Sequence, residues 1–186
     1  MYPELKYSKQ EIADYLNRVT PEMVKATLHK AGGRGFFDLL NLISPAGANF
    51  IPEMTEIAQR YRRMYYGKTV RIYAPLYISN FCINSCKYCD FNCHNKSDRK
   101  ELDIGEIIEE AKAIKAQNID SLLLVAGEDP RRMTADFLAE VAKEMRKIFS
   151  YLSIEVAPMS EADYRKLFEA GVEGVTLYQE TYDKDL

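Results

Sequence analysis

The feature that most constrains the fold is an alternation of strand and helix patterns that begins after Gly67. Four strand-like runs are separated by helical patterns, and they cover residues 70–78, 121–126, 152–157 and 172–178. The second run, SLLLVA, has no polar alternation, which is typical of a parallel strand that is buried on both faces. Four such units in tandem predict a parallel α/β sheet.

A parallel sheet of this kind belongs either to a barrel or to an open fold. A complete barrel of eight strand–helix units needs roughly 250 residues, and residues 68–186 supply about half of the repeats. We therefore expect the first half of a (β/α) TIM-type barrel, within a fragment of a longer chain. The alternative is a small open sheet that is complete by itself, which would leave one face of its last strand uncovered.

Residues 1–67 are predicted to form a separate helical segment with four helices. Their starts are marked by capping residues, an apolar run or a proline: Ser8 with Glu11, Thr20 with Pro21, Phe36, and Pro52. Ser8 and Glu11 have the spacing of a capping box, and Gly67 has the position of a C-terminal cap after the last helix. The expected organisation is a helical segment, 1–67, followed by the barrel strands, 68–186.

The overall charge excludes one class of partner. The net charge is -3 and the isoelectric point is near 5.6, which offers no basic face to nucleic acid phosphates. The opening residues lack the apolar core of a signal peptide, and the longest apolar run is only 122–126. We therefore expect a cytoplasmic protein without a membrane span. In a reducing cytosol, clustered thiols bind metals more often than they form disulfides.

All four cysteines lie in one short segment, directly after the first predicted strand. Cys82, Cys86 and Cys89 form the pattern Cys-x3-Cys-x2-Cys. Three thiolates on one loop can hold three corners of a cubane [4Fe-4S] cluster and leave the fourth iron open for substrate chemistry. This loop would lie at the C-terminal mouth of a barrel, where barrel enzymes keep their active sites.

Two other interpretations of the cysteines remain open. A structural zinc site usually has four ligands in two separated pairs, and the nearby extra candidates here are Cys93 and His94. If Cys93 were the fourth ligand of an iron–sulfur cluster, the cluster would be closed and the protein would be an electron carrier. We expect three ligands, with Cys93 a free thiol and His94 a solvated loop residue.

The spacing of the three cysteines, with Tyr88 directly before Cys89, resembles the signature of the radical S-adenosylmethionine superfamily. The resemblance implies a [4Fe-4S] cluster on Cys82, Cys86 and Cys89. It also implies that the amino and carboxylate groups of S-adenosyl-L-methionine chelate the open iron. One electron from the cluster would then split the sulfonium to give a 5'-deoxyadenosyl radical.

A second motif, Ala126-Gly127-Glu128, ends the second predicted strand. It resembles the Gly-Gly-Glu segment that supports the methionyl amino group in this superfamily, with Ala126 in the place of the first glycine. Small residues let backbone carbonyl groups approach an ammonium group, and a glutamate adds negative charge. The motif is therefore expected to bind the cofactor.

Further cofactor contacts are expected from the cysteine segment and from the strand ends. The full set is Tyr88, Ala126, Gly127, Glu128, Glu155, Gln179 and Glu180. Glu155 stands between apolar neighbours in the third strand, where burial is costly without a partner; a structural lysine or arginine is an equal alternative to the ligand. The residues that lead into the loop, Tyr77, Ser79 and Asn80, are candidates for the same cavity. No catalytic residue is assigned.

The resemblance extends to the aromatic amino acid lyase branch of the superfamily over roughly residues 36–186. It rests on the stretches LISPAGANF, VRIYAPLYISNFCINSCKYC, LLLVAGED and IEVAPMSEADYRKLFEAGVEGVTLYQETYD. It departs at Asp90, where the family has a glycine, so that a charge stands beside the third cysteine.

The branch implies a reaction and partners. It implies cleavage of the Cα–Cβ bond of L-tyrosine to 2-iminoacetate and p-cresol, for the thiazole moiety of thiamine. Thiazole synthase would be the protein partner, and reduced flavodoxin or ferredoxin the electron donor. The tyrosine lyase that matures [FeFe]-hydrogenase shares these motifs and stays an alternative, with the cysteines of its second cluster expected beyond Leu186.

Overall fold

The computed structural model describes residues 6–178 and residue 180. The chain divides into two compact units, Met1–Thr69 and Val70–Leu186, each with its own internal contacts. The two units are described separately below.

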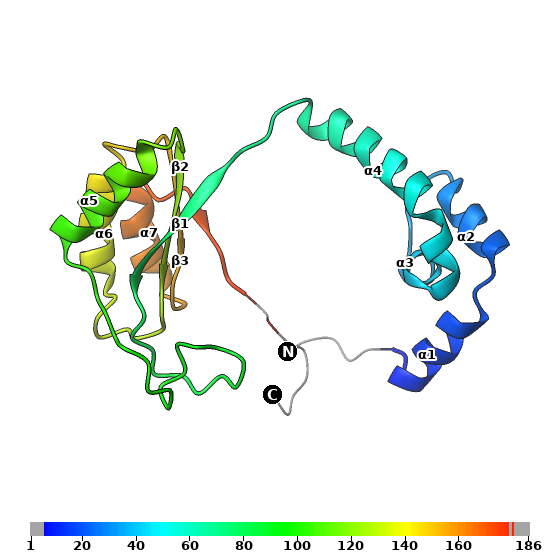
Figure 1. Ribbon diagram of the computed structural model, residues 1–186, viewed down its shortest axis with the longest axis horizontal. Helices are drawn as coiled ribbons and strands as arrows, with labels where there is room; N and C mark the ends of the chain where they lie inside the picture. The colour runs from blue at the N-terminus through cyan, green and yellow to red at the C-terminus, as the bar shows by residue number, and fades with distance from the viewer. Residues whose placement is uncertain (1–5, 179, 181–186) are drawn as a thin grey trace. The chain divides into compact units, whose positions relative to one another are not determined.

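The described part of the first unit, residues 6–69, contains four α-helices, as predicted, and one 3-10 helix (Figure 1). The elements are α1 (Lys9–Arg18), α2 (Pro21–Leu28), α3 (Phe36–Ile43), the 3-10 helix η1 (Pro45–Phe50) and α4 (Ile51–Tyr66). The capping box predicted for α1 is present, because Glu11 N–H donates to Ser8 Oγ at 3.2 Å and Ser8 N–H donates to the Glu11 carboxylate at 2.7 Å. Gly67 ends α4 at a φ of 60°, which suits a residue without a side chain.

The 3-10 helix was not predicted. Pro45 opens it, and the Ser44 hydroxyl caps it by accepting from Gly47 N–H at 3.2 Å. Its last residue, Phe50, is buried with Val19, Val24 and Leu28 in the core of the first unit. Burial of these four apolar side chains joins α2 to the start of α4.

The second unit is a four-stranded parallel sheet with strand order β1-β2-β3-β4, which confirms the predicted parallel α/β class. Its strands are β1 (Tyr73–Ser79), β2 (Ser121–Ala126), β3 (Tyr151–Glu155) and β4 (Gly174–Val175). The helices between them are α5 (Ile104–Lys115), α6 (Ala135–Met145) and α7 (Glu161–Glu169), and all three cover the same face of the sheet (Figure 1).

Three of the strands have ends that differ from the prediction, because a strand extends only as far as its partner allows. The third strand covers Tyr151–Glu155 instead of 152–157. The first strand begins at Tyr73 rather than at residue 70, since Tyr73 pairs with Ser121, the first residue of β2. The fourth strand covers Gly174–Val175 instead of 172–178. In the described part of the chain it pairs with β3. The residues directly before and after β4 also donate backbone hydrogen bonds to Leu152 O and Ile154 O, which lengthens the contact by one residue at each end.

The two faces of the sheet have different surroundings. The helix-covered face holds the main core, which includes the fully buried side chains of Ile78, Ile107, Leu122, Leu124, Leu138, Met145, Leu152, Ile154 and Leu167. The opposite face carries Tyr73, Tyr77, Val125 and Glu155, and these side chains line a cavity. The C-terminal ends of the strands meet at one edge, where the cysteine segment begins.

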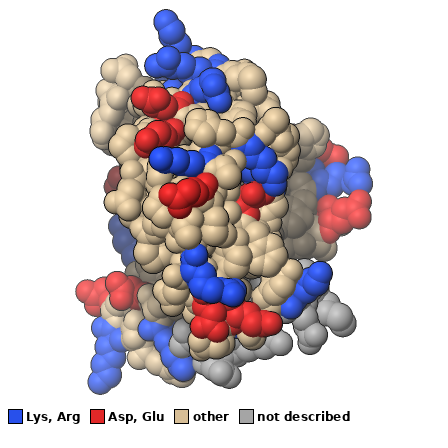
Figure 2. Space-filling view, turned by 90° about the vertical axis from the view of Figure 1, so that its right-hand side faces the viewer, with Lys and Arg blue, Asp and Glu red and all other residues tan. Residues whose placement is uncertain are grey.

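Two surface properties bear on the class of protein. None of the helices in the described part of the chain is both long and apolar enough to cross a membrane. On the face that Figure 2 displays, basic and acidic side chains lie among each other between large areas of uncharged residues. This mixed surface agrees with the small net charge of -3 and gives no phosphate-binding stripe on that face.

Candidate functional site

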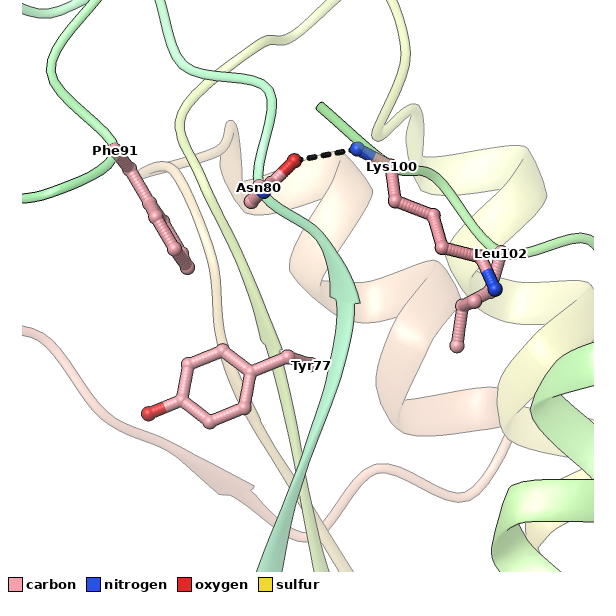
Figure 3. Close-up of a pocket in the computed structure, with 5 residues that line it drawn as sticks. All are labelled: Tyr77, Asn80, Phe91, Lys100 and Leu102. Carbon is pink, nitrogen blue, oxygen red and sulfur yellow. Dashed lines mark hydrogen bonds between the residues drawn. The ribbon is translucent and has the colours of Figure 1, made fainter. Parts of the chain in front are cut away.

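The four cysteines lie on a long loop, residues 81–99, that leaves the C-terminal end of β1 and returns to it. We call this segment the cysteine loop. Its base is closed by Asn80 and Lys100: Asn80 N–H donates to Lys100 O at 3.1 Å, and Lys100 N–H donates to Asn80 Oδ1 at 2.7 Å (Figure 3). An antiparallel bridge between Ser79 and Glu101 follows directly. The two ends of the loop are therefore held together at the rim of the sheet.

Within the loop, one turn connects the second and third cysteines, and another turn follows the third. Cys89 N–H donates to Cys86 O at 3.3 Å, and Asn92 N–H donates to Cys89 O at 3.0 Å. The Asn92 side chain also donates to Cys86 O at 2.9 Å. Cys82, Cys86 and Cys89 are half-buried free thiols, whereas Cys93 is exposed. The structure thus separates Cys93 from the other three by its exposure.

The cysteine thiols can be compared with the ligands that a zinc ion and a [4Fe-4S] cluster each require. Among the described residues, no three His, Cys, Asp or Glu side chains are arranged to hold one metal ion. A structural zinc ion needs four ligands that converge on one point. In a [4Fe-4S] cluster each thiolate binds a different iron atom, so the thiols need not converge. Three half-buried thiols on one loop are a donor set of the kind that such a cluster uses.

The second motif packs directly against the cysteine loop. Gly127 N–H donates to Ser79 O at 2.9 Å, and Glu128 O accepts from Ile83 N–H at 2.9 Å. A Cβ atom on Gly127 would collide with Phe81 O and would lie 3.1 Å from Cys82 Cβ. Only a residue without a side chain allows this approach. Two motifs that are far apart in the sequence therefore form one site.

Side chains around the second motif hold the loop from outside. Glu128 Oε2 accepts from the Asn84 amide at 2.6 Å. The neighbouring Asp129 is buried and forms ion pairs with Arg131 at 3.6 Å and Arg132 at 3.5 Å. The guanidinium of Arg132 lies 3.9 Å from the centre of the Phe81 ring, a cation–π contact beside Cys82. Sequence analysis did not identify Asn84 or Arg132, because neither belongs to a recognisable motif.

A cavity of about 600 Å³ lies on the sheet face opposite the helices. It is lined by Tyr73, Pro75, Tyr77, Leu123, Val125, Glu155, Tyr178 and Glu180. Glu155 and Glu180, two of the expected cofactor contacts, therefore share one cavity. Gln179 lies outside the described residues.

The cavity raises the pKa of Glu155 above its ordinary value. Burial is the main cause and the nearby charge of Glu180 adds to it, while a hydrogen bond from Tyr178 partly opposes both. The pKa of Tyr178 is raised in turn, chiefly by the charge of Glu155. No ion pair of the described residues involves Glu155, so a structural lysine or arginine partner, the other interpretation of this residue, is not observed.

Tyr88 links the cysteine loop to the cavity. The pKa of its phenol is raised first by desolvation, then by the charge of Cys86 and a hydrogen bond to that thiol, and further by Glu180. Glu180 also faces Glu155. The negative charges of the cavity and the thiols of the loop are thus within electrostatic reach of one another.

The residues that lead into the loop differ in their contacts, although Tyr77 and Asn80 line one hollow in common. Tyr77 lines the cavity and meets the Phe91 ring edge-on, with ring centres 6.0 Å apart. Ser79 is buried, and its hydroxyl accepts from Phe81 N–H at 3.2 Å. Asn80 closes the loop base and lines a second hollow of about 470 Å³; Figure 3 shows Tyr77 and Phe91 on one side of β1 and Lys100 on the other.

Comparison with known proteins agrees with this geometry. The family model described as the Radical SAM superfamily matches residues 76–186. The chain is 40% identical over 145 residues to 2-iminoacetate synthase of Escherichia coli (strain K12), a match that covers 78% of this chain and 38% of that protein. It is 32% identical over 152 residues to 3-methylornithine synthase of Methanosarcina acetivorans, with coverage of 80% and 43%.

Solved structures give the same result. The crystal structure of HydG, a maturase of the [FeFe]-hydrogenase, is similar with a TM-score of 0.81 and 26% identity, and the match covers 96% of this chain and 42% of HydG. The chain spans well under half the length of the relatives that it matches.

Proposed function

The chain belongs to the radical SAM superfamily, and from this membership we propose that the protein is a lyase that cleaves the Cα–Cβ bond of L-tyrosine. The products would be 2-iminoacetate and p-cresol. Members of the superfamily are enzymes that use a [4Fe-4S] cluster and S-adenosylmethionine. When bound, these cofactors supply a 5'-deoxyadenosyl radical.

In this proposal Cys82, Cys86 and Cys89 hold three iron atoms of the cluster. All three thiols are half-buried, and backbone hydrogen bonds fix the turns at Cys86 and Cys89. Cys93 is left out, because its thiol is exposed and only its backbone N–H is used, donating to Asn84 O at 2.8 Å. With three protein ligands, the cluster would keep one iron free for S-adenosylmethionine, which would distinguish this enzyme from an electron carrier with a closed cluster.

The second motif is proposed to hold the ammonium group of S-adenosylmethionine. Gly127 brings the backbone of Ala126–Glu128 against Cys82, and Asn84 holds the Glu128 carboxylate beside the loop. A carboxylate beside a cationic ligand strengthens binding through charge-assisted hydrogen bonds.

The rest of the cofactor is proposed to extend into the cavity. Tyr88, Glu155, Gln179 and Glu180 would contact it there. Leu123 and Val125 form a buried apolar part of the cavity wall, whereas Tyr73, Tyr77 and Tyr178 in the same lining are exposed. A buried apolar wall would help to keep water from a reactive radical, which protects it from side reactions.

The observation that carries the substrate is the 40% identity to 2-iminoacetate synthase over 145 residues. By this likeness the 2-iminoacetate would serve synthesis of the thiamine thiazole, with thiazole synthase as partner and reduced flavodoxin or ferredoxin as electron donor. We place the protein in the cytoplasm, because free thiols persist in that reducing compartment. The likeness to HydG supports a second candidate, a role in [FeFe]-hydrogenase maturation.

The proposal is tested by product analysis on the reduced full-length protein with S-adenosylmethionine and L-tyrosine. We expect 5'-deoxyadenosine together with p-cresol, and glyoxylate from hydrolysis of 2-iminoacetate, in mass spectrometry. The variant Cys86→Ala should give none of these, whereas the matched control Cys93→Ala should give all of them. Deoxyadenosine without p-cresol at saturating tyrosine would reject the substrate, and carbon monoxide with cyanide would favour the hydrogenase maturase.

A further inference from the structure

Arg99 forms an unusual set of hydrogen bonds near the end of the cysteine loop. Its guanidinium donates only to backbone carbonyl groups, and the acceptors are Asn80 O at 2.6 Å, Phe91 O at 3.0 Å, Asn92 O at 2.6 Å and Asn95 O at 3.4 Å. The side chain is half-buried. No ion pair of the described residues involves Arg99, so its charge is balanced by carbonyl dipoles alone.

The acceptors lie on both sides of the three cysteines, which divide the segment 80–99 into a first limb up to Cys82 and a second limb after Cys89. Asn80 precedes the first cysteine, Cys82, whereas Phe91 and Asn92 follow the third, Cys89. The Asn84–Glu128 bond and the Arg132–Phe81 contact each hold only the first limb, and they tie it to the second motif. Arg99 instead connects the first limb to the second, and so encloses all three cysteines between its contacts.

The chemistry of the side chain suits this function. A guanidinium has five N–H donors in a rigid plane, so it can bond to several carbonyl groups in different directions at once. A long loop without regular structure loses much conformational entropy when it is ordered. A half-buried positive charge on the loop is also favourable for three thiolates and for the anionic group that they form.

We propose that Arg99 is a positioning residue that presets the spacing of Cys82, Cys86 and Cys89 before the cluster is assembled. It acts through the backbone of the two limbs and does not touch the reacting atoms. The effect of Arg99 on cluster assembly rests on the proposed function. Its effect on the order of the loop does not depend on that proposal.

The test compares full-length Arg99→Gln and Arg99→Lys with the control Arg146→Gln. The Arg146 guanidinium also binds two backbone carbonyl groups, those of Phe149 and Ser150. These follow α6 and precede β3, which places them at the opposite edge of a parallel sheet from the cysteine loop. The control therefore reports a general loss of stability without a change in the loop.

The first measurement is hydrogen–deuterium exchange in the protein without cluster. In Arg99→Gln the amides of Cys89, Asn92 and Cys93 should exchange about tenfold faster, as expected when a charge-assisted hydrogen bond is lost. Arg146→Gln should leave them unchanged. Arg99→Lys, which keeps the charge but not the planar donors, should lie between the wild type and Arg99→Gln. If circular dichroism shows that Arg99→Gln does not fold, the exchange of the same three amides in Arg99→Lys decides the question: faster exchange than in the wild type supports the proposal, and wild-type exchange overturns it.

The second measurement is iron content and the electron paramagnetic resonance spectrum after anaerobic reconstitution. Arg99→Gln should take up less than about half of the wild-type iron and should show a broadened spectrum, with partial recovery in Arg99→Lys. Wild-type exchange in Arg99→Gln, or faster exchange with wild-type iron and spectrum, would overturn the proposal. If the wild type itself takes up no cluster, the proposed function fails, and the exchange data still decide whether Arg99 orders the loop.

Discussion

At the scale of single residues, Gly127 has the strictest requirement in the site. Its place against Phe81 O and Cys82 Cβ leaves no room for a methyl group. The clash would be with backbone rather than with a flexible side chain, so the loop itself would have to move. One missing side chain thus fixes the distance between the second motif and the cysteine loop.

The substitution Gly127→Ala should therefore disturb both stability and cluster binding. We expect a loss of about 1–3 kcal/mol in the free energy of unfolding, the usual cost of overpacking a tight site, together with a lower iron content. The control is Gly33→Ala, because nothing lies within 4 Å of a Cβ built on Gly33. Chemical denaturation and iron analysis measure the two effects; equal results for both variants would contradict the tight contact.

Glu155 provides a prediction about pH. Its pKa is raised above the ordinary value of 4.5, mainly by burial. The protonated form is thus favoured by folding, and the stability that it contributes is complete at low pH and lost as the pH rises through the folded pKa. Glu155→Gln keeps the neutral form at every pH, so its stability relative to the wild type should increase between pH 4 and pH 8.

The measurement for Glu155 is a series of denaturation curves between pH 4 and pH 8. The control is Glu169→Gln, an exposed glutamate at the end of α7, which should show no such trend relative to the wild type. A difference between Glu155→Gln and the wild type that is constant with pH, or that falls as the pH rises, would show that burial does not act on this carboxyl group.

At the scale of elements, α5 follows the cysteine loop directly and begins with a capping box. Glu106 N–H donates to Asp103 Oδ1 at 2.8 Å, and Asp103 N–H donates to the Glu106 carboxylate at 3.1 Å. Asp103→Ala should lower the free energy of unfolding by about 0.5–2 kcal/mol, the usual cost of losing such a cap. Urea denaturation checks this; a loss no larger than that of Glu110→Ala, an exposed position on the same helix, would contradict it.

The elements also show which features a sequence can predict. The helix starts at Ser8 and Thr20 were predicted well, because these caps are local signals whose bonds span three residues. The ends of β1 and β4 were not, because a strand ends where its partner ends. The 3-10 helix after Ser44 was missed, since its only local signals are a serine and a proline.

The site divides in the same way. The three cysteines were predicted from their spacing, and Gly127 from the resemblance of Ala126-Gly127-Glu128 to a family motif; both are properties of short segments. Asn84, Arg99 and Arg132 were missed, because each acts through contacts that only the folded chain creates, such as the Asn84–Glu128 bond across 44 positions. Motifs predict which chemistry a site performs, whereas the residues that hold the motifs in place depend on the path of the loop.

At the scale of the whole molecule, the second unit brings its predicted site residues to one edge of a parallel sheet. The cysteine loop follows β1, the Gly127-Glu128 motif follows β2, and Glu155 ends β3. Ligand sites at the C-terminal ends of parallel strands are general in α/β proteins. The family match over residues 76–186 covers this arrangement, and the first unit lies outside that match.

The central claim is that the three cysteines and the Gly127-Glu128 motif form one site for a cluster and S-adenosylmethionine. It is tested most directly by electron paramagnetic resonance of the reduced full-length protein before and after S-adenosylmethionine is added. We predict that the ligand changes the spectrum of the wild type and of Cys93→Ala. In Glu128→Gln the same change should require about 10- to 100-fold more ligand, the effect of a weakened charge-assisted hydrogen bond. An unchanged spectrum in the folded, cluster-loaded wild type would contradict the account, as would loss of the cluster in Cys93→Ala.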